Sequence, residues 1–205
     1  GYIEAKLLFI HILAGAQNKS YGNQDPTLSS GGLLYSGNSR PMPKISIGTN
    51  GYVPIPFTKG FVEVDGYMEN GWFENDRNKW MDSGRHMHNV LFHHKHIQGR
   101  IGGKFPVHFT WGFYHFAQWA GKNPDSANAL PTDLDAFRRV FLVENASNSS
   151  SHNHSDVLNK SGNHIGGRIF GLEAELKNMN INIYWQTIFE DGSGLIWSNI
   201  SDGLW

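Results

Sequence analysis

The sequence predicts an all-β fold of long antiparallel strands, from its composition, its two-residue hydrophobic alternation and the spacing of its turns. The chain has 205 residues, of which 24 are glycine and 13% are aromatic, whereas only 39% are hydrophobic. Abundant glycines and aromatics with few aliphatic residues are typical of strands joined by many turns. We therefore expect residues 1–205 to belong to one β-domain.

Seven segments have the hydrophobic alternation of a strand. In the first, Glu4 and Lys6 share one face, although Leu8 and Ile10 continue that face less cleanly. The second is interrupted by "GNSRPMP". The expected strands are residues 2–14, 28–48, 61–71, 90–101, 105–119, 164–177 and 180–189, and an eighth follows near Leu195.

The connection over residues 120–163 carries the one helix that the sequence predicts. In "PTDLDAFRRVFL", Thr132 is a possible N-cap, acidic residues occupy the first turn and basic residues follow. The polar stretch "NASNSSSHNHSDVLNKSGN" has no capacity to bury itself. We expect one short helix within a long loop.

The fifth strand shows the alternation most clearly. Its odd positions are apolar and its even positions largely polar, and the seventh strand repeats this with isoleucines and Trp185 opposite Asn182 and Gln186. One face would contact lipid and the other would line a lumen. The apolar set is Phe105, Val107, Phe109, Trp111 and Phe113, and the polar set is His108, Thr110, Tyr114 and Gln118.

The connections alternate in length. Long loops follow the first, third and fifth strands, short turns follow the second, fourth and sixth, and "EDGSG" after the seventh is the exception. Short turns at one end and long loops at the other are typical of an antiparallel transmembrane (outer-membrane) β-barrel, here a partial barrel of about eight long strands. A soluble β-sandwich has the same alternation along each strand, but its strands are usually only about 5–6 residues long.

Charge and cysteine content exclude several classes of function. Seventeen basic residues balance 18 acidic ones without a basic stripe, so we expect no nucleic-acid partner. The chain has no cysteine, which excludes disulfides, thiolate metal sites and cysteine nucleophiles. The apolar run over residues 7–14 is too short to cross a bilayer as a helix.

Several strings resemble the bacterial capsule assembly protein family known as Wzi, in the branch found in Bacteroidetes. They are "SGNSRPMPKISIGTNGYVPIPF", "HHKHIQGRIGGKFPVHFTWGFYHFAQWAG", "LPTDLDAFRRVFL", "GNHIGGRIFGLE", "YWQTIFEDGSG" and "NISDGLW". The resemblance implies a monomeric barrel in the cell outer membrane that acts as a lectin and holds exported capsular polysaccharide. The chain would then be an internal fragment of that barrel, with outer-membrane lipid as its other partner.

Sugar recognition needs aromatic faces for the C–H surface of the ring and planar polar groups for its hydroxyls. Residues of both kinds lie in the expected loops, although the pattern favours an interfacial aromatic belt for Trp72 and Trp80 over sugar binding by a small margin. The candidate carbohydrate-binding residues are Trp72, Phe73, Asn75, Arg77, Trp80, Arg85 and Trp197. The resemblance further implies lumen or rim positions for His93 and Lys95, which match a His-x-Lys pattern of the family, and for Asn163, His164 and Gln186.

No catalytic or metal site is predicted. Glu190 and Asp191 are adjacent and point to opposite faces, so they cannot flank a glycosidic bond. The pairs His86 with His88 and His94 with His96 could each share a face, but no further ligand is fixed by the spacing. The sequence thus predicts a binding protein without a cofactor. A porin-like channel and a soluble all-β carbohydrate-active protein remain the alternatives.

Overall fold

The described part of the chain folds into one antiparallel sheet of nine strands with a single helix, α1 (Leu134–Leu142). The computed structural model describes residues 1–20, 27, 32, 34–35, 38–75, 87–122, 129–144 and 162–190. The strands are β1 (Tyr2–Leu7), β2 (Ile10–Gly15), β3 (Lys44–Thr49), β4 (Val53–Pro54), β5 (Val62–Trp72), β6 (Leu91–Ile101), β7 (Val107–Trp119), β8 (Asn163–Leu176) and β9 (Met179–Phe189).

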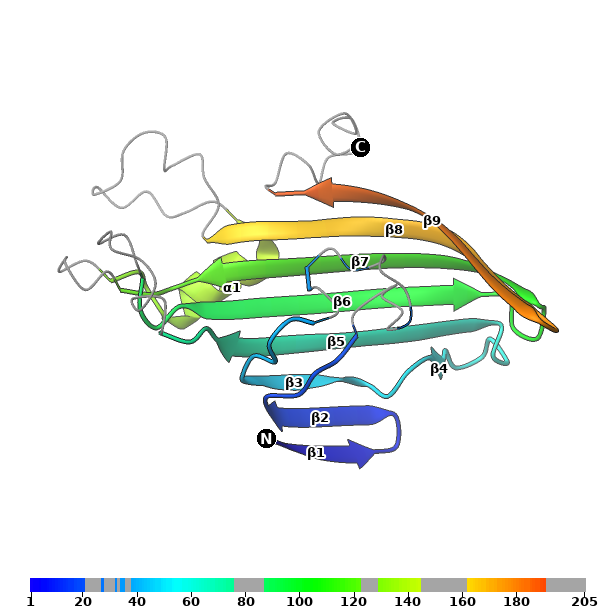
Figure 1. Cartoon of the computed structure of the whole chain (residues 1–205), viewed down its shortest axis with the longest axis horizontal. Helices are drawn as coiled ribbons and strands as arrows, with labels where there is room; N and C mark the ends of the chain where they lie inside the picture. The colour runs from blue at the N-terminus through cyan, green and yellow to red at the C-terminus, as the bar shows by residue number, and fades with distance from the viewer. Residues whose placement is uncertain are drawn as a thin grey trace.

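The sheet is an open meander in which each strand pairs with its neighbour in sequence. Its order is β1-β2-β3-β5-β6-β7-β8-β9, and β4 adds two residues to β5 (Figure 1). Strands β1 and β9 lie at opposite edges, so the sheet is not closed. The all-β, antiparallel prediction is confirmed at this level.

The first two predicted strands are wrong in their bounds. Residues 2–14 form a hairpin, because the chain reverses at Leu8, whose backbone is left-handed at φ 54°, and Leu7 pairs with Ile10. This reversal explains the poor alternation there, and no glycine or proline in the sequence marks the turn. Within the second predicted strand, 28–48, the described residues 38–43 are not in a strand, and β3 starts at Lys44, directly after Pro43.

The corrected boundaries make the alternation of connections regular among the described strands. Short turns join β1 to β2, β6 to β7 and β8 to β9, and a compact link containing β4 joins β3 to β5. The connections after β2, β5 and β7 are long, and they start and finish at the opposite end of the sheet, where these strands end and the next ones begin (Figure 1). The predicted eighth strand near Leu195 and the "EDGSG" link from Asp191 onward lie outside the described residues.

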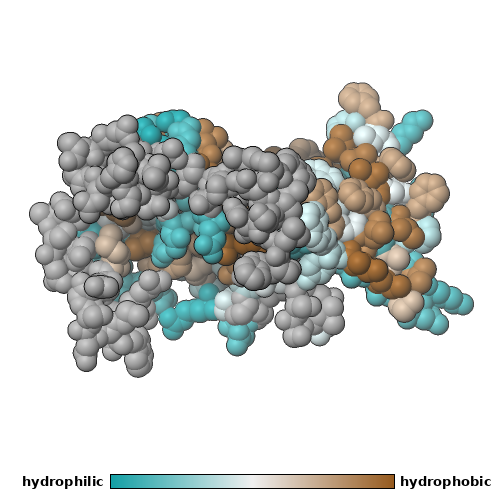
Figure 2. Space-filling model, turned by 90° about the horizontal axis from the view of Figure 1, so that it is seen from above, coloured by the Kyte–Doolittle hydropathy of each residue, from teal (hydrophilic) through white to brown (hydrophobic). Residues whose placement is uncertain are grey.

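The register places the apolar positions of every strand on the same face, which we call the apolar face. In β7, β8 and β9, for example, Phe109 pairs with Leu172, which pairs with Ile183. Figure 2 shows apolar residues gathered at the end of the sheet where the short turns lie. Large side chains exposed on this face include Ile3, Leu7, Ile12, Ile45, Ile47, Ile97, Val107, Phe109, Leu172, Ile183 and Trp185.

The opposite, polar face carries most of the ionisable and hydroxyl groups of the strands. Toward the long-loop end its side chains are buried: Glu69 is 0% exposed and His94 1%. The buried members of this face include Lys44, Ser46, Tyr67, Glu69, Phe92, His94, His96, His108, Thr110 and Tyr114, together with Leu13 and Ile169. The sheet therefore buries polar side chains on one face and exposes large apolar side chains on the other.

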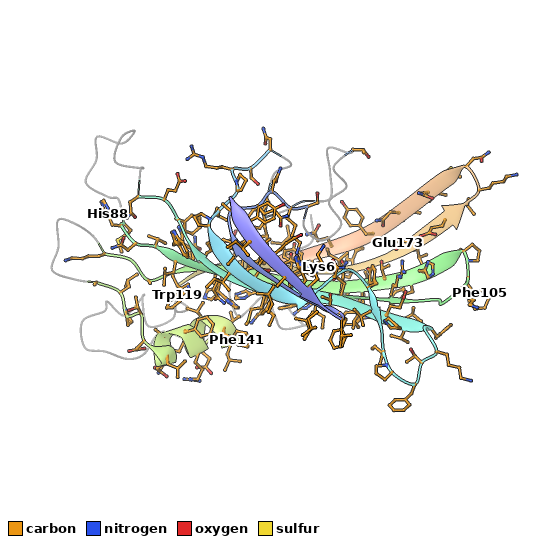
Figure 3. The ribbon with its side chains drawn as sticks, turned by 90° about the horizontal axis from the view of Figure 1, so that it is seen from below. Lys6, His88, Phe105, Trp119, Phe141 and Glu173 are labelled. Atoms are coloured by element: carbon orange, nitrogen blue, oxygen red, sulfur yellow. The ribbon has the colours of Figure 1, made fainter. Side chains whose placement is uncertain are left out.

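Helix α1 packs on the apolar face near the long-loop end (Figure 3). It begins at Asp133, whose side chain accepts a hydrogen bond of 2.8 Å from the Ala136 amide, so the cap is one residue later than the predicted Thr132. Ala136 and Val140 are buried against Ala117 and Trp119 of the sheet end. No helix in the described ranges has the length and apolarity needed to cross a membrane.

The packing on the polar face predicts that two strand glycines, Gly71 and Gly112, differ in how well they tolerate substitution by alanine. A Cβ at Gly71 would overlap the Pro43 carbonyl oxygen and the Phe92 ring, whereas a Cβ at Gly112 would meet its nearest atom, Gln98 Cβ, at 3.5 Å. We expect Gly71→Ala to lower the free energy of unfolding by about 1–3 kcal/mol. Urea unfolding in detergent micelles would show this. Equal stability of Gly71→Ala and the control Gly112→Ala would contradict the packing.

Candidate functional site

A buried charged cluster lies on the polar face at the long-loop end, centred on Glu69 of β5. The register sets Glu69 between Ser46 of β3 and His94 of β6, and Lys44 reaches it from the start of β3. Glu69 Oε2 lies 3.3 Å from Lys44 Nζ and 3.5 Å from His94 Nδ1. The side chains of all three residues are at most 4% exposed, so the ion pair is removed from solvent.

Aromatic rings surround this cluster. Tyr67 lies edge-on between His94 and His96, with each pair of ring centroids 5.1 Å apart. From the segment after β2, Tyr35 contacts the His94 ring at 5.6 Å, and Lys19 Nζ lies 4.0 Å from the centre of the Tyr67 ring. Burial raises the pKa of the Tyr35 hydroxyl, and the charge of Glu69 raises it further.

These contacts hold part of the β2–β3 connection against the polar face. Lys19 and Tyr35 come from that connection, and both rest on side chains of β5 and β6. Because Glu69 and His94 are shielded from solvent, they are arranged to bind one another and not an external ligand. The chemistry of this cluster is therefore structural: it fixes a covering segment on the sheet.

A second polar group, the histidine–lysine cluster, lies on the apolar face beneath α1. It consists of His93, Lys95, His115 and His164. His115 Nε2 and His164 Nδ1 are 2.8 Å apart, within hydrogen-bond distance. His93 Nδ1 lies 2.9 Å from the side-chain oxygen of Asn70.

Helix α1 covers His93 and Lys95 of the histidine–lysine cluster through its phenylalanines. The Lys95 ammonium donates to the Phe141 carbonyl at the helix end and lies 4.1 Å from the centre of the Phe141 ring. The His93 ring contacts Phe137 at 5.4 Å and Phe141 at 5.3 Å. A cation near the last carbonyls of a helix also favours its dipole. Lys95 is thus a docking point for α1.

Toward the short turns the polar face carries accessible ion pairs. Arg100 Nε donates to Glu63 at 2.6 Å, and the Arg100 guanidinium lies 4.5 Å from the centre of the Tyr52 ring. Asp65 accepts from Thr49 at 2.5 Å and from Gln98 at 3.3 Å. These groups give the polar face a hydrogen-bonded surface over the length of β5 and β6.

The candidate sugar-binding residues do not form one platform. Trp72, half exposed, ends β5 on the apolar face, whereas Phe73 turns to the other side and packs on Phe92 and Phe116. Asn75 exchanges hydrogen bonds with Asn89, the side-chain pair at 2.9 Å and the Asn89 amide at 2.8 Å, and so ties the two ends of the β5–β6 connection. Arg77, Trp80, Arg85 and Trp197 lie outside the described residues.

The residues expected at the lumen or rim divide between the two faces. His93, Lys95 and His164 belong to the histidine–lysine cluster on the apolar face. Asn163 is exposed at the start of β8, and Gln186 donates to the Tyr114 hydroxyl on the polar face. The His-x-Lys pattern therefore positions α1, a role that could not be predicted without the contacts between the helix and the sheet.

The histidine pairs do not build a metal centre in the described ranges, where no group of three or more potential ligands converges. The Tyr67 ring contacts both His94 and His96. His88 forms an isolated bridge with Lys122 through backbone atoms, and His86 lies outside the described residues.

Sequence reasoning missed Lys44, Tyr35 and the pairing of Glu69 with His94. Alternation places Glu69 and His94 on definite faces of their strands, but only the register between β5 and β6 sets them opposite each other. Comparison with models of known protein families, with curated proteins and with solved structures found no match for the chain. What the chain does is therefore inferred from its two faces and its motifs.

Removal of one charge from the polar-face cluster should destabilise the fold more than removal of both. Glu69→Gln leaves the buried Lys44 ammonium without the carboxylate it contacts, and we expect a loss of about 3–5 kcal/mol. The double variant Lys44→Met/Glu69→Met contains neither charge of this pair. Its loss of unfolding free energy should therefore be smaller than that of the single variant Glu69→Gln. Urea unfolding of Lys44→Met, Glu69→Met and the double variant measures the coupling, and strictly additive losses would contradict it.

Proposed function

We propose that the chain forms part of an outer-membrane β-barrel whose apolar face contacts lipid and whose polar face lines the interior. The observation that supports this most directly is the exposure of large apolar side chains on one face of β1, β2, β3, β6, β7, β8 and β9. Ile183 is 66% exposed and Ile3 79%, although both belong to regular paired strands. In lipid such a face is favourable, and the polar groups then lie in the lumen.

A soluble sandwich is the weaker explanation of the same sheet. A sandwich would cover the apolar face with a second sheet, and α1 covers only its long-loop end. An uncovered apolar surface over several strands is uncommon on a soluble monomer. The open edges at β1 and β9 are also disfavoured in lipid, so the proposal requires further strands to complete the barrel.

Within such a barrel we propose a lectin role, the anchoring of exported capsular polysaccharide at the cell surface. The support is the motif resemblance to the Wzi family together with the long connections gathered at one end of the sheet. Aromatic and amide side chains at that end, Trp72 and Asn75 among them, are of the types that bind sugars. The proposal assigns the chain no catalytic step.

A porin-like channel is the second candidate, since it uses the same architecture. The contacts of Lys19 and Tyr35 with the polar face favour an obstructed interior over an open pore. Single-channel recording of the full-length protein separates the two. A large ohmic conductance would support the channel and contradict the anchoring role.

A charge on the apolar face should impair membrane assembly. Ile183→Arg places a guanidinium toward lipid, at a cost of about 2–4 kcal/mol near the bilayer centre. Its neighbour Asn182 points to the opposite face, so Asn182→Arg is the matched control. We expect the heat-modifiable, folded form in the outer membrane to decrease only for Ile183→Arg. Equal assembly of both variants would exclude the lipid-facing assignment.

Loss of the protein should release the capsule. In a strain that lacks the gene, we expect capsular polysaccharide to move from the cells to the medium with its total amount unchanged, because anchoring and not synthesis is removed. An immunoassay of both fractions measures this, and re-expression of the wild-type gene is the control. Unchanged retention on the cells would contradict the anchoring role while leaving the barrel assignment intact.

A further inference from the structure

At one level of the sheet, the side chains on the apolar face change from apolar to polar or charged. From the short-turn end, β7 presents only apolar side chains on this face up to Phe113, and the next position is His115. On β6 the change falls between Ile97 and Lys95, which pair with Phe113 and His115. On β8 the apolar run ends at Phe170 and is followed by Arg168. The change from apolar to polar side chains thus occurs at nearly the same level on β6, β7 and β8, with a difference of at most one or two residue pairs in the register.

The apolar strip below this boundary is shorter than an outer-membrane hydrocarbon band. From Val107 to Phe113 the strand advances by about 20 Å, and a tilt of about 40° reduces this to about 15 Å along the membrane normal. The apolar band of outer-membrane barrels is about 25 Å tall. About 10 Å of the band is therefore not supplied by the strands. At that level the sheet carries the histidine–lysine cluster, which would contact lipid if nothing covered it.

Helix α1 covers that level. Its inner side buries Val140 and Ala136 on the sheet, and Lys95 binds the Phe141 carbonyl. A helix with its side chains is about 10 Å thick, close to the height that the strip lacks. Figure 3 shows α1, with Phe141, against this side of the sheet near Trp119.

The outer side of α1 suits the boundary between acyl chains and headgroups. Leu134 is 81% exposed and Leu142 53% exposed, and they are two turns apart. The charges between them pair within the helix region: Arg138 Nη1 lies 2.7 Å from Glu144, and Arg139 Nε lies 2.7 Å from Asp135. Exposed leucines and charged side chains thus occur together on the part of the helix that faces away from the sheet, and an interfacial helix likewise combines apolar and charged surface.

We propose that α1 is a membrane-interface helix: it lies on the outside of the barrel, shields the histidine–lysine cluster from lipid, and completes the apolar band with Leu134 and Leu142. Its partner is the outer leaflet at the level where acyl chains meet headgroups. This inference rests on the proposed membrane barrel and adds to it a lipid-contacting surface supplied by a loop and not by a strand.

Nitroxide labelling tests the proposal. The chain has no cysteine, so Leu134→Cys and Leu142→Cys each give one labelled site in it, and both positions are exposed enough to tolerate a label. Ile183→Cys reports on the apolar face of the strands, and Glu173→Cys reports on the polar face. The labelled protein is reconstituted into phosphatidylcholine vesicles, and collisions with oxygen, which enters lipid, are compared with collisions with a water-soluble nickel chelate.

We expect the ratio of oxygen to nickel collisions at both α1 positions to exceed that at Glu173→Cys and to fall below that at Ile183→Cys. Nickel-dominated collisions at both α1 positions, with oxygen-dominated collisions at Ile183→Cys, would overturn this inference and leave the barrel standing. Exclusion of both reagents from α1 would also overturn it, in favour of a protein contact. Nickel-dominated collisions at Ile183→Cys would overturn the proposed barrel together with the inference.

Discussion

The antiparallel register that keeps every apolar position on one face is the constraint on which the rest of this structure depends. Side chains alternate with a period of two, so a slip of one residue between β6 and β7 would move Phe109 and Trp111 to the polar face and expose His108 in their place. Because each strand pairs only with its neighbour, one consistent register carries the separation across the whole sheet.

The two ends of the sheet differ because segments of the long connections pack on its faces, whereas the short turns do not. On the polar face, Lys19 and Tyr35 rest on the rings around Glu69, and on the apolar face α1 rests on His93 and Lys95. Both coverings bury ionisable groups, and a nearby partner offsets part of the cost for Glu69, which lies against Lys44, and for Lys95, which binds the Phe141 carbonyl at the helix end. The short-turn end keeps its apolar side chains exposed.

Much of the fold could be predicted from the sequence, and the errors have physical causes. The long strands β5 to β9 follow directly from alternation, since one apolar and one polar face impose a clear period. The β1–β2 hairpin was missed because its turn uses Leu8 in a left-handed conformation, without glycine, asparagine or proline. The helix cap was displaced by one residue because Thr132 and Asp133 are both good caps, and only the backbone geometry selects Asp133.

The sequence by itself determined the two faces of the sheet and the alternation of short and long connections, because both are local properties of strands and turns. Only the tertiary structure decided which residues meet. The contact of Glu69 with Lys44 and His94, and the docking of α1 on Lys95, join segments that are distant in the chain. Such contacts depend on the register between strands and on the path of a returning loop, and neither is encoded in the spacing of any one segment.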